Sequence, residues 1–276
     1  MSKLLHAGFI RMFKSRTLLI CLAILGFTNG ISLVINYIQG SKTDLPDSFL
    51  LSGLILVSIM AAVVVSSYLG AEHRFGTIRN KLIIGHSRGS VYASSFLVCL
   101  AGVLTMFALV WILTIVLGNL LLGGFAQSNA VLCMLLLRSF LAITVLTALY
   151  TALALCIQSK SKGSVAAVII AFVLMLTAVA VVQMLSEPAY LPAESVVSTE
   201  EIQYEPVPDD PSLVINPYYV GGTKRMVYQV IHDLCPVSQM IQESDALTGN
   251  MILIPVAEIV ILLAAGMVIF KKRDLK

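Results

Sequence analysis

The sequence predicts an all-α membrane protein with six transmembrane helices. Apolar residues make up 58% of the 276 residues and charged residues only 12%, which leaves too little polar surface to cover a water-soluble globule of this length. Long apolar runs alternate with short polar segments, and about 20 helical residues cross the roughly 30 Å of hydrocarbon in a bilayer. The lipid bilayer is therefore the expected surroundings of most of the chain.

Six apolar runs are long enough to cross the bilayer. They are Thr17 to Ile38, Phe49 to Leu69, Val91 to Leu117, Ser139 to Gln158, Val165 to Leu185 and Met251 to Phe270. Residues 130–137 are apolar but too short to cross, and we interpret them as a shallow lead-in that leaves Arg138 at the outer interface. Residues 1–16 have a basic start and an apolar face, which predicts an N-terminal interfacial helix on the cytoplasmic surface.

The distribution of basic residues predicts the orientation. With a cytoplasmic N-terminus, fourteen Lys and Arg residues fall in cytoplasmic connections and four in external ones, so both termini are expected in the cytoplasm. Residues 186–250 then form a long extracellular segment between the fifth and sixth helices. Its proline-rich first half predicts an extended strap, and Met226 to Leu234 predict an amphipathic helix over the outer ends of the spans. A lid over a pathway and an ordinary connection are both compatible with this segment.

The cytoplasmic connection over residues 71–90 has the most specific pattern in the chain. Charged, glycine and threonine residues recur in it before the third span begins: Glu72, Arg74, Gly76, Thr77, Arg79, Gly85 and Arg88. This pattern resembles that of type-2 ABC exporter permeases, including those of bacterial peptide and lantibiotic export. The resemblance implies that these seven residues belong to a short ATPase-coupling helix that sits in a groove of a separate ATPase subunit. The alternative is that the charges only enforce the positive-inside topology.

The resemblance extends over the whole chain, 1–276, as a single transmembrane permease domain. It implies the bacterial cell membrane, two ATPase copies, and a second permease copy or a similar permease. It also implies export of an amphipathic or hydrophobic cargo, such as a peptide, lantibiotic, drug or lipid-like molecule. One departure is that Ser94 and Ser95 stand where family members often carry a lysine.

Cofactor and nucleic-acid binding are not expected of this chain. The sequence contains no G-x-x-x-x-G-K-[ST] motif, so ATP and magnesium are expected on the partner ATPase, and no metal or cofactor site is expected here. The G-x-S-x-G match at 85–89 lies at a membrane interface rather than in a soluble sheet, so no catalytic residue is predicted. The basic residues lie between apolar runs rather than on one helix face, which argues against nucleic acid.

Two charges in the apolar runs are candidates for function or for packing. Glu258 is the single acid within the six runs, and an ionisable group at that depth is costly. Arg138 begins the fourth run at a comparable outer level, so we predict an ion pair between them, within one chain or across two copies. A secondary transporter or channel without an ATPase is the alternative function, although a proton-coupled transporter usually has more intramembrane acids. A membrane anchor or sensor is a third hypothesis.

Overall fold

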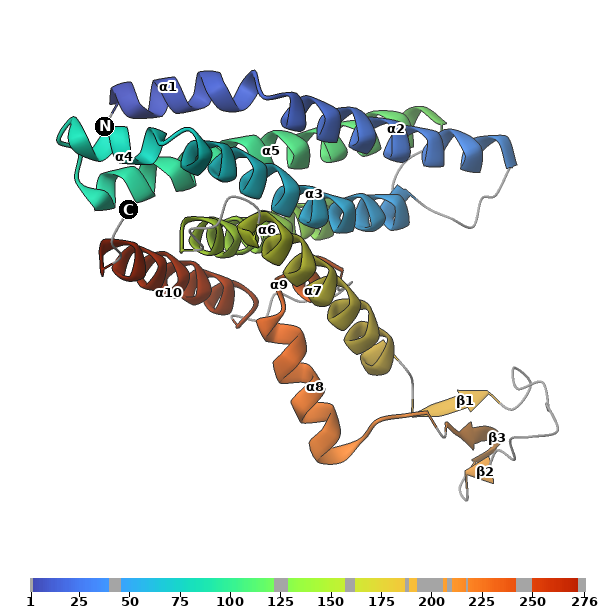
Figure 1. Ribbon diagram of the computed structural model, residues 1–276. Coiled ribbons are helices and arrows are strands. Elements are labelled where there is room, and N and C mark those ends of the chain that lie inside the picture. Colours follow the sequence, from blue (N-terminus) through green and yellow to red (C-terminus); the bar gives the residue numbers. More distant parts are fainter. Residues whose placement is uncertain are drawn as a thin grey trace.

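The computed structural model describes residues 2–39, 46–121, 129–156, 162–186, 189–192, 206–207, 210–216, 218–241 and 250–272. The helices in these ranges are α1 (Ser2–Phe13), α2 (Arg16–Gln39), α3 (Pro46–Arg74), α4 (Thr77–Ile83), α5 (Arg88–Leu121), α6 (Asn129–Cys156), α7 (Lys162–Ser186), α8 (Gly222–Leu234), α9 (Pro236–Ile241) and α10 (Asn250–Lys272). The strands are β1 (Tyr190–Pro192), β2 (Pro206–Val207) and β3 (Asp210–Ile215). Figure 1 shows their arrangement.

Six helices are long and apolar enough to cross a membrane: α2, α3, α5, α6, α7 and α10. This confirms the predicted all-α bundle with six spans. The helices α3, α5 and α6 form its centre and have the most buried side chains, while α2, α7 and α10 pack around them and expose more apolar surface. Fully buried Tyr92 and Tyr150 fill the largest volumes in this centre. The exposed apolar faces of the outer helices match what lipid or a second membrane protein would cover.

The fourth span is longer than the sequence predicted. Helix α6 runs without a break from Asn129 to Cys156, so residues 130–137 are the first turns of the same helix as the fourth span, and their shallow position in the membrane stays a prediction. The physical reason is that these residues are all apolar and contain no glycine or proline that would end a helix. Arg138 consequently lies inside the helix, and its side chain is buried among protein side chains.

Helix α1 packs against the first half of α5. Leu4, Gly8 and Met12 recur every four residues, so they share one face, and all three are buried. A Cβ atom at Gly8 would lie 2.6 Å from Val98 Cγ2, so only a residue without a side chain allows this close approach. The predicted N-terminal helix therefore exists, and its position at a membrane surface stays a prediction.

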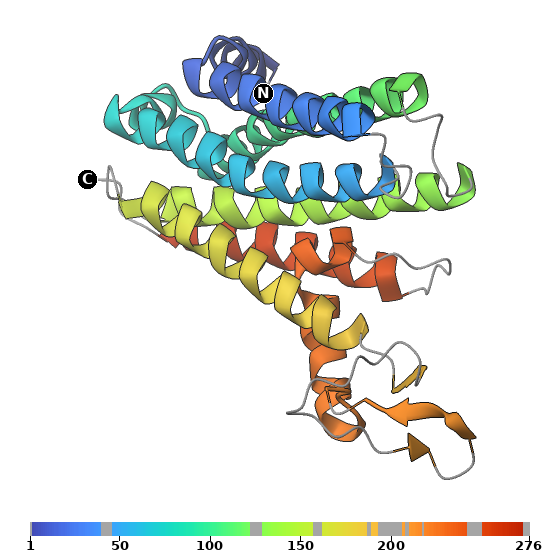
Figure 2. The ribbon, with the colours of Figure 1, turned by 90° about the vertical axis from the view of Figure 1, so that its right-hand side faces the viewer.

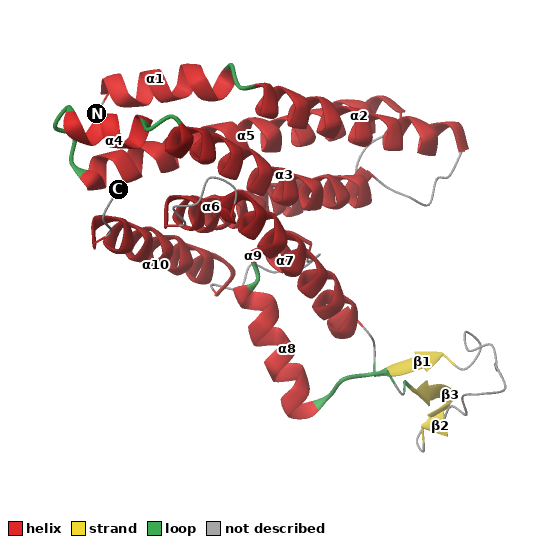
Figure 3. Ribbon diagram, viewed as in Figure 1, coloured by secondary structure: helices red, strands yellow, loops and turns green. Residues whose placement is uncertain are grey.

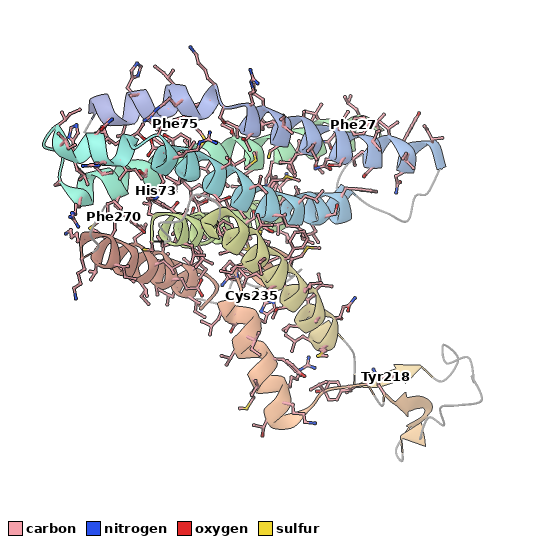
Figure 4. All side chains as sticks on the ribbon, viewed as in Figure 1. Phe27, His73, Phe75, Tyr218, Cys235 and Phe270 are labelled. Atoms are coloured by element: carbon pink, nitrogen blue, oxygen red, sulfur yellow. The ribbon has the colours of Figure 1, made fainter. Side chains whose placement is uncertain are left out.

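The connection between α7 and α10 re-enters the bundle. Arg225 Nη2 donates to the carbonyl of Leu185 at the end of α7 (3.0 Å), and Cys235 Sγ donates to the carbonyl of Leu174 in its middle (3.7 Å). Helix α8 therefore runs antiparallel along the second half of α7. Figure 4 shows Cys235 at the junction of α8 and α9, next to the long helices.

Helix α9 follows α8 into the core, where Val237 and Met240 are fully buried against α3, α6 and α7. The predicted amphipathic helix is thus confirmed as a helix, but its placement over the outer ends of the spans is wrong. The physical reason is that Cys235, Val237 and Met240 gain burial only when the end of α8 is drawn into the bundle.

A small antiparallel sheet precedes α8. Strand β3 is its centre, with β1 and β2 on either side, and Tyr190 pairs with Ile215. Pro192 and Pro206 lie in the two edge strands, where a missing N–H costs no ladder hydrogen bond. The sheet lies apart from the long helices in both ribbon views (Figure 2, Figure 3). The predicted extended strap therefore includes paired strands; its residues 193–205 lie outside the described ranges.

Candidate coupling site

The connection between α3 and α5 is a short helix held between two glycine turns. Gly76 and Gly85 have φ angles of 64° and 99°, a region that side chains with a Cβ rarely adopt. Thr77 Oγ1 donates to the carbonyl of Glu72 (2.9 Å), which fixes the turn between α3 and α4. The predicted segment 71–90 therefore contains the end of α3, a sharply bounded short helix, α4, and the start of α5.

Helix α4 has one face on the bundle and one face outside it. Ile78 is buried and Leu82, one turn later, packs against the same core. Other apolar residues around α4 are exposed: Phe75 in the preceding turn, Ile83 and Ile84 are 67%, 71% and 77% exposed. Figure 4 shows Phe75 at this end of the molecule. We call these three residues, with Arg74 and Arg79, the α4 surface.

The two arginines of the α4 surface are also exposed, and Arg74 lies over the Phe75 ring with its Cζ 4.7 Å from the ring centroid. An exposed apolar cluster rimmed by cations is typical of a protein interaction site. Among the described residues, no group of three His, Cys, Asp or Glu side chains could hold a metal ion.

Glu72 lies beneath this helix rather than on its exposed surface. Its side chain is only 3% exposed, and its Oε1 is 2.9 Å from Arg11 Nη2 on α1. Lys81 Nζ on α4 donates to both carboxylate oxygens, at 2.8 and 2.9 Å, and the Tyr68 hydroxyl donates to Oε1 at 3.3 Å. The prediction that Glu72 belongs to a surface offered to a partner needs correction, because its oxygens are bound by cations of its own chain. We call Arg11, Glu72 and Lys81 the Glu72 cluster.

The far end of the connection is tied to the last helix. Arg88 Nη1 donates to the carbonyl of Lys271 at the end of α10, at 2.7 Å. A cation is favourable at a helix C-terminus, where carbonyl groups lack helical partners. Helix α4 is thus fixed at both ends: the Glu72 cluster reaches α1 and α3, and Arg88 holds the start of α5 against α10.

The predicted Arg138–Glu258 ion pair is not present within one copy of the chain. Among the described residues, Arg138 Nη2 donates to the main-chain carbonyl of Gln239 on α9, at 3.0 Å, and no salt bridge joins it to Glu258. Glu258 Oε2 is buried without a hydrogen-bond partner among the described residues. The single-chain form of that prediction is wrong because α9, which the sequence placed outside, supplies an acceptor instead. A pair across two copies stays a prediction.

The sequence pattern missed three of the residues that matter here. Lys81 lies nine residues after Glu72, and a turn of unknown geometry separates them, so no helical spacing rule links the two. Arg11 is 61 positions earlier and has no local signal of its partner. Gln239 contributes a main-chain carbonyl, which side-chain patterns do not reveal.

Comparison with known proteins identifies the family. Residues 4–178, more than half of the chain, match the model of the ABC-2 family transporter protein. The chain belongs to this family. The match includes α1 to α6 and most of α7, and therefore the α4 surface and the Glu72 cluster; α8, α9 and α10 follow it. A search of curated proteins found no match. The resemblance to ABC permeases predicted from residues 71–90 is confirmed, and this chain is a membrane permease of ABC-transporter type, which implies that it works with an ABC ATPase subunit.

Proposed function

We propose that this ABC-2 permease exports an amphipathic or hydrophobic cargo and receives its driving force at α4. The observation that supports this most directly is the α4 surface, where Phe75, Ile83 and Ile84 are exposed beside two arginines. These residues follow the end of one long apolar helix and precede the start of the next, so lipid is not their natural cover. A protein groove with apolar walls and acidic rims would cover them.

The proposed assembly has two permease copies and two ATPase subunits in a bacterial cell membrane, with the ATPases bound in the cytoplasm. ATP and magnesium would be held by the ATPase, because this sequence has no phosphate-binding loop. The cargo class is argued from the spans, whose faces offer almost entirely apolar side chains to a pathway or to lipid. Helix α4 joins two of these spans through tight turns, so a displacement of α4 is transmitted to both.

A docking experiment tests this proposal. The permease is purified with its ABC ATPase subunit, and the ATPase retained per permease is measured. Ile83→Asp and Ile84→Asp place a buried acid in the interface and should lower retention by about tenfold or more, the effect of losing at least about 1.4 kcal/mol of binding free energy.

Tyr218→Asp is the matched control, because Tyr218 is also an exposed apolar residue, 60% accessible, and lies far from α4 near the small sheet. It should leave retention unchanged. Equal ATPase retention by both α4 variants and the control would contradict docking on α4. Transport by this polypeptide alone, driven by an ion gradient, would support a secondary transporter instead.

A further inference from the structure

The Glu72 cluster joins three elements that lie far apart in the sequence. Glu72 is in the last turn of α3, Arg11 in α1 and Lys81 in α4. A carboxylate that is 3% exposed is stable as an anion only where cations and hydrogen-bond donors replace water. The cluster therefore holds the three elements at a fixed mutual position.

Little else joins α1 directly to α4. A groove of about 300 Å³ separates them, lined by Leu4, Ala7 and Arg11 of α1 and by residues of the α4 segment that include Asn80, Lys81 and Ile84. A second cavity of about 220 Å³ lies between α1 and the turn from α3 to α4, and Arg11, Tyr68, Glu72 and Phe75 are among its lining residues. The Glu72 cluster lies where these two hollows meet, so charge rather than apolar packing bridges them.

The two cations differ in exposure. The Lys81 side chain is 14% exposed and contacts both carboxylate oxygens, whereas the Arg11 side chain is 42% exposed and contacts one. When the contact with Arg11 breaks, Glu72 keeps Lys81, a mostly buried partner. When the contact with Lys81 breaks, the buried carboxylate of Glu72 keeps only the half-exposed Arg11. Lys81 is therefore the firmly held partner of Glu72, and Arg11 is the partner that dissociates more easily.

We infer that Glu72 is a positioning residue that fastens the N-terminal helix α1 to the coupling helix α4, so that α1 moves with α4 and sets the coupling efficiency. The inference rests on the proposed function. Glu72 acts through Arg11 and Lys81 and touches no ATPase. The N-terminal helix would then take part in coupling, and it borders the α4 surface, because Phe75 and Ile84 also line the two hollows.

Two measurements test the inference on the purified permease and on its complex with the ATPase. The first is the rate of chemical cross-linking between Ala7→Cys and Asn80→Cys, two residues that line the groove, in a variant without the five native cysteines. The second is the ATPase rate in the complex relative to that of the free ATPase. Arg11→Gln should lower the cross-linking rate by about tenfold, the effect of about 1.4 kcal/mol, and should abolish the stimulation while the ATPase stays bound.

Lys14→Gln is the matched control, because Lys14 is an exposed cation three positions further along and no ion pair with it occurs among the described residues. It should change neither quantity. Glu72→Gln should reproduce the effect of Arg11→Gln, and Glu72→Asp, which restores the charge, should recover part of the cross-linking. Where Glu72→Gln fails to fold, Arg11→Gln decides alone, because it leaves Glu72 paired with Lys81.

Unchanged cross-linking and unchanged stimulation in Arg11→Gln would overturn the inference. The proposed function fails in a different way, by an absence of ATPase binding to the unaltered permease. In that case the cross-linking measurement still decides whether the cluster holds α1 to α4.

Discussion

Two connections of this permease are held by different main contacts, although arginines donate to main-chain carbonyls in both. The α4 connection is short and is fixed by charged side chains, with Glu72 bound by Arg11 and Lys81 and with Arg88 on the end of α10. The α8–α9 connection is long and is fixed by buried apolar residues and by main-chain carbonyls, which accept from Arg138, Arg225 and Cys235.

This difference has a mechanical consequence. Ion pairs between side chains are directional and can exchange partners, so the α4 connection is held together but can be displaced. Apolar burial and bonds to main-chain carbonyls leave fewer alternatives, because each lost contact exposes a buried group. The α4 connection is therefore suited to receive a force, and the α8–α9 connection is suited to stay packed while the spans around it move.

The prediction with the largest expected effect concerns what covers the exposed apolar side chains of α8. Met226, Val230 and Leu234 are more than half exposed on α8, yet the contacts with Leu185 and Leu174 place this helix along the second half of α7. We expect lipid to cover them. In a variant without native cysteines, Val230→Cys should react with a membrane-impermeant maleimide at least about tenfold more slowly than Tyr218→Cys, because hydrocarbon suppresses thiolate formation.

Mass spectrometry of the labelled protein measures this difference. Solubilisation in denaturing detergent is the control, since it should make both cysteines equally reactive. Equal reaction rates in intact membranes would show that water, not lipid, covers this face of α8.

The second prediction concerns a substitution that removes a buried polar contact of the α8–α9 connection, the hydrogen bond from Arg138 to Gln239. Arg138 is 5% exposed and donates to the carbonyl of Gln239. Arg138→Met leaves that carbonyl without its charged donor and should lower the free energy of unfolding by about 2 to 4 kcal/mol. Arg225→Met removes a comparable bond, to Leu185, from a less buried arginine and should cost about 1 kcal/mol.

Unfolding of the purified permease by SDS, starting from mild detergent, gives both values. If the two substitutions cost the same, burial of Arg138 is not what makes its contact strong. If neither lowers stability, main-chain carbonyls do not hold this connection.

The sequence predicted the α4 connection better than the α8–α9 connection, and the reason is physical. Glycines and clustered charges are visible in the residues themselves, and the family resemblance carried by Gly76, Gly85 and Arg79, among others, implied a short helix here. The apolar stripe of α8 was equally visible, but the same stripe suits a helix on a surface and a helix in lipid. Periodicity reports which face is apolar and does not report what covers it.

The burial of the Glu72 side chain could not be predicted from the sequence, for a related reason. A charged residue in a polar connection is normally exposed, and Glu72 is buried because Arg11 and Lys81 come to it from two other helices. Likewise, Arg138 and Glu258 looked like partners because the sequence placed both at a comparable outer level of their spans. The insertion of α9 beside Arg138 is a tertiary event with no local signal.

The smallest expected effect concerns these two charges. Since Arg138 binds the Gln239 carbonyl and no salt bridge joins it to Glu258 within one copy, the substitutions Arg138→Met and Glu258→Met should be nearly additive in the isolated permease. The coupling free energy from a double-mutant cycle should stay below about 0.5 kcal/mol.

The same cycle is repeated on permease reconstituted at a density at which copies associate. A coupling above about 1 kcal/mol only under these conditions would show that Arg138 of one copy pairs with Glu258 of the other. A coupling of that size in the isolated chain would contradict the separation of the two charges. Additivity under both conditions would leave the unpartnered Oε2 of Glu258 as a polar atom available to a cargo, in a helix that otherwise offers apolar side chains.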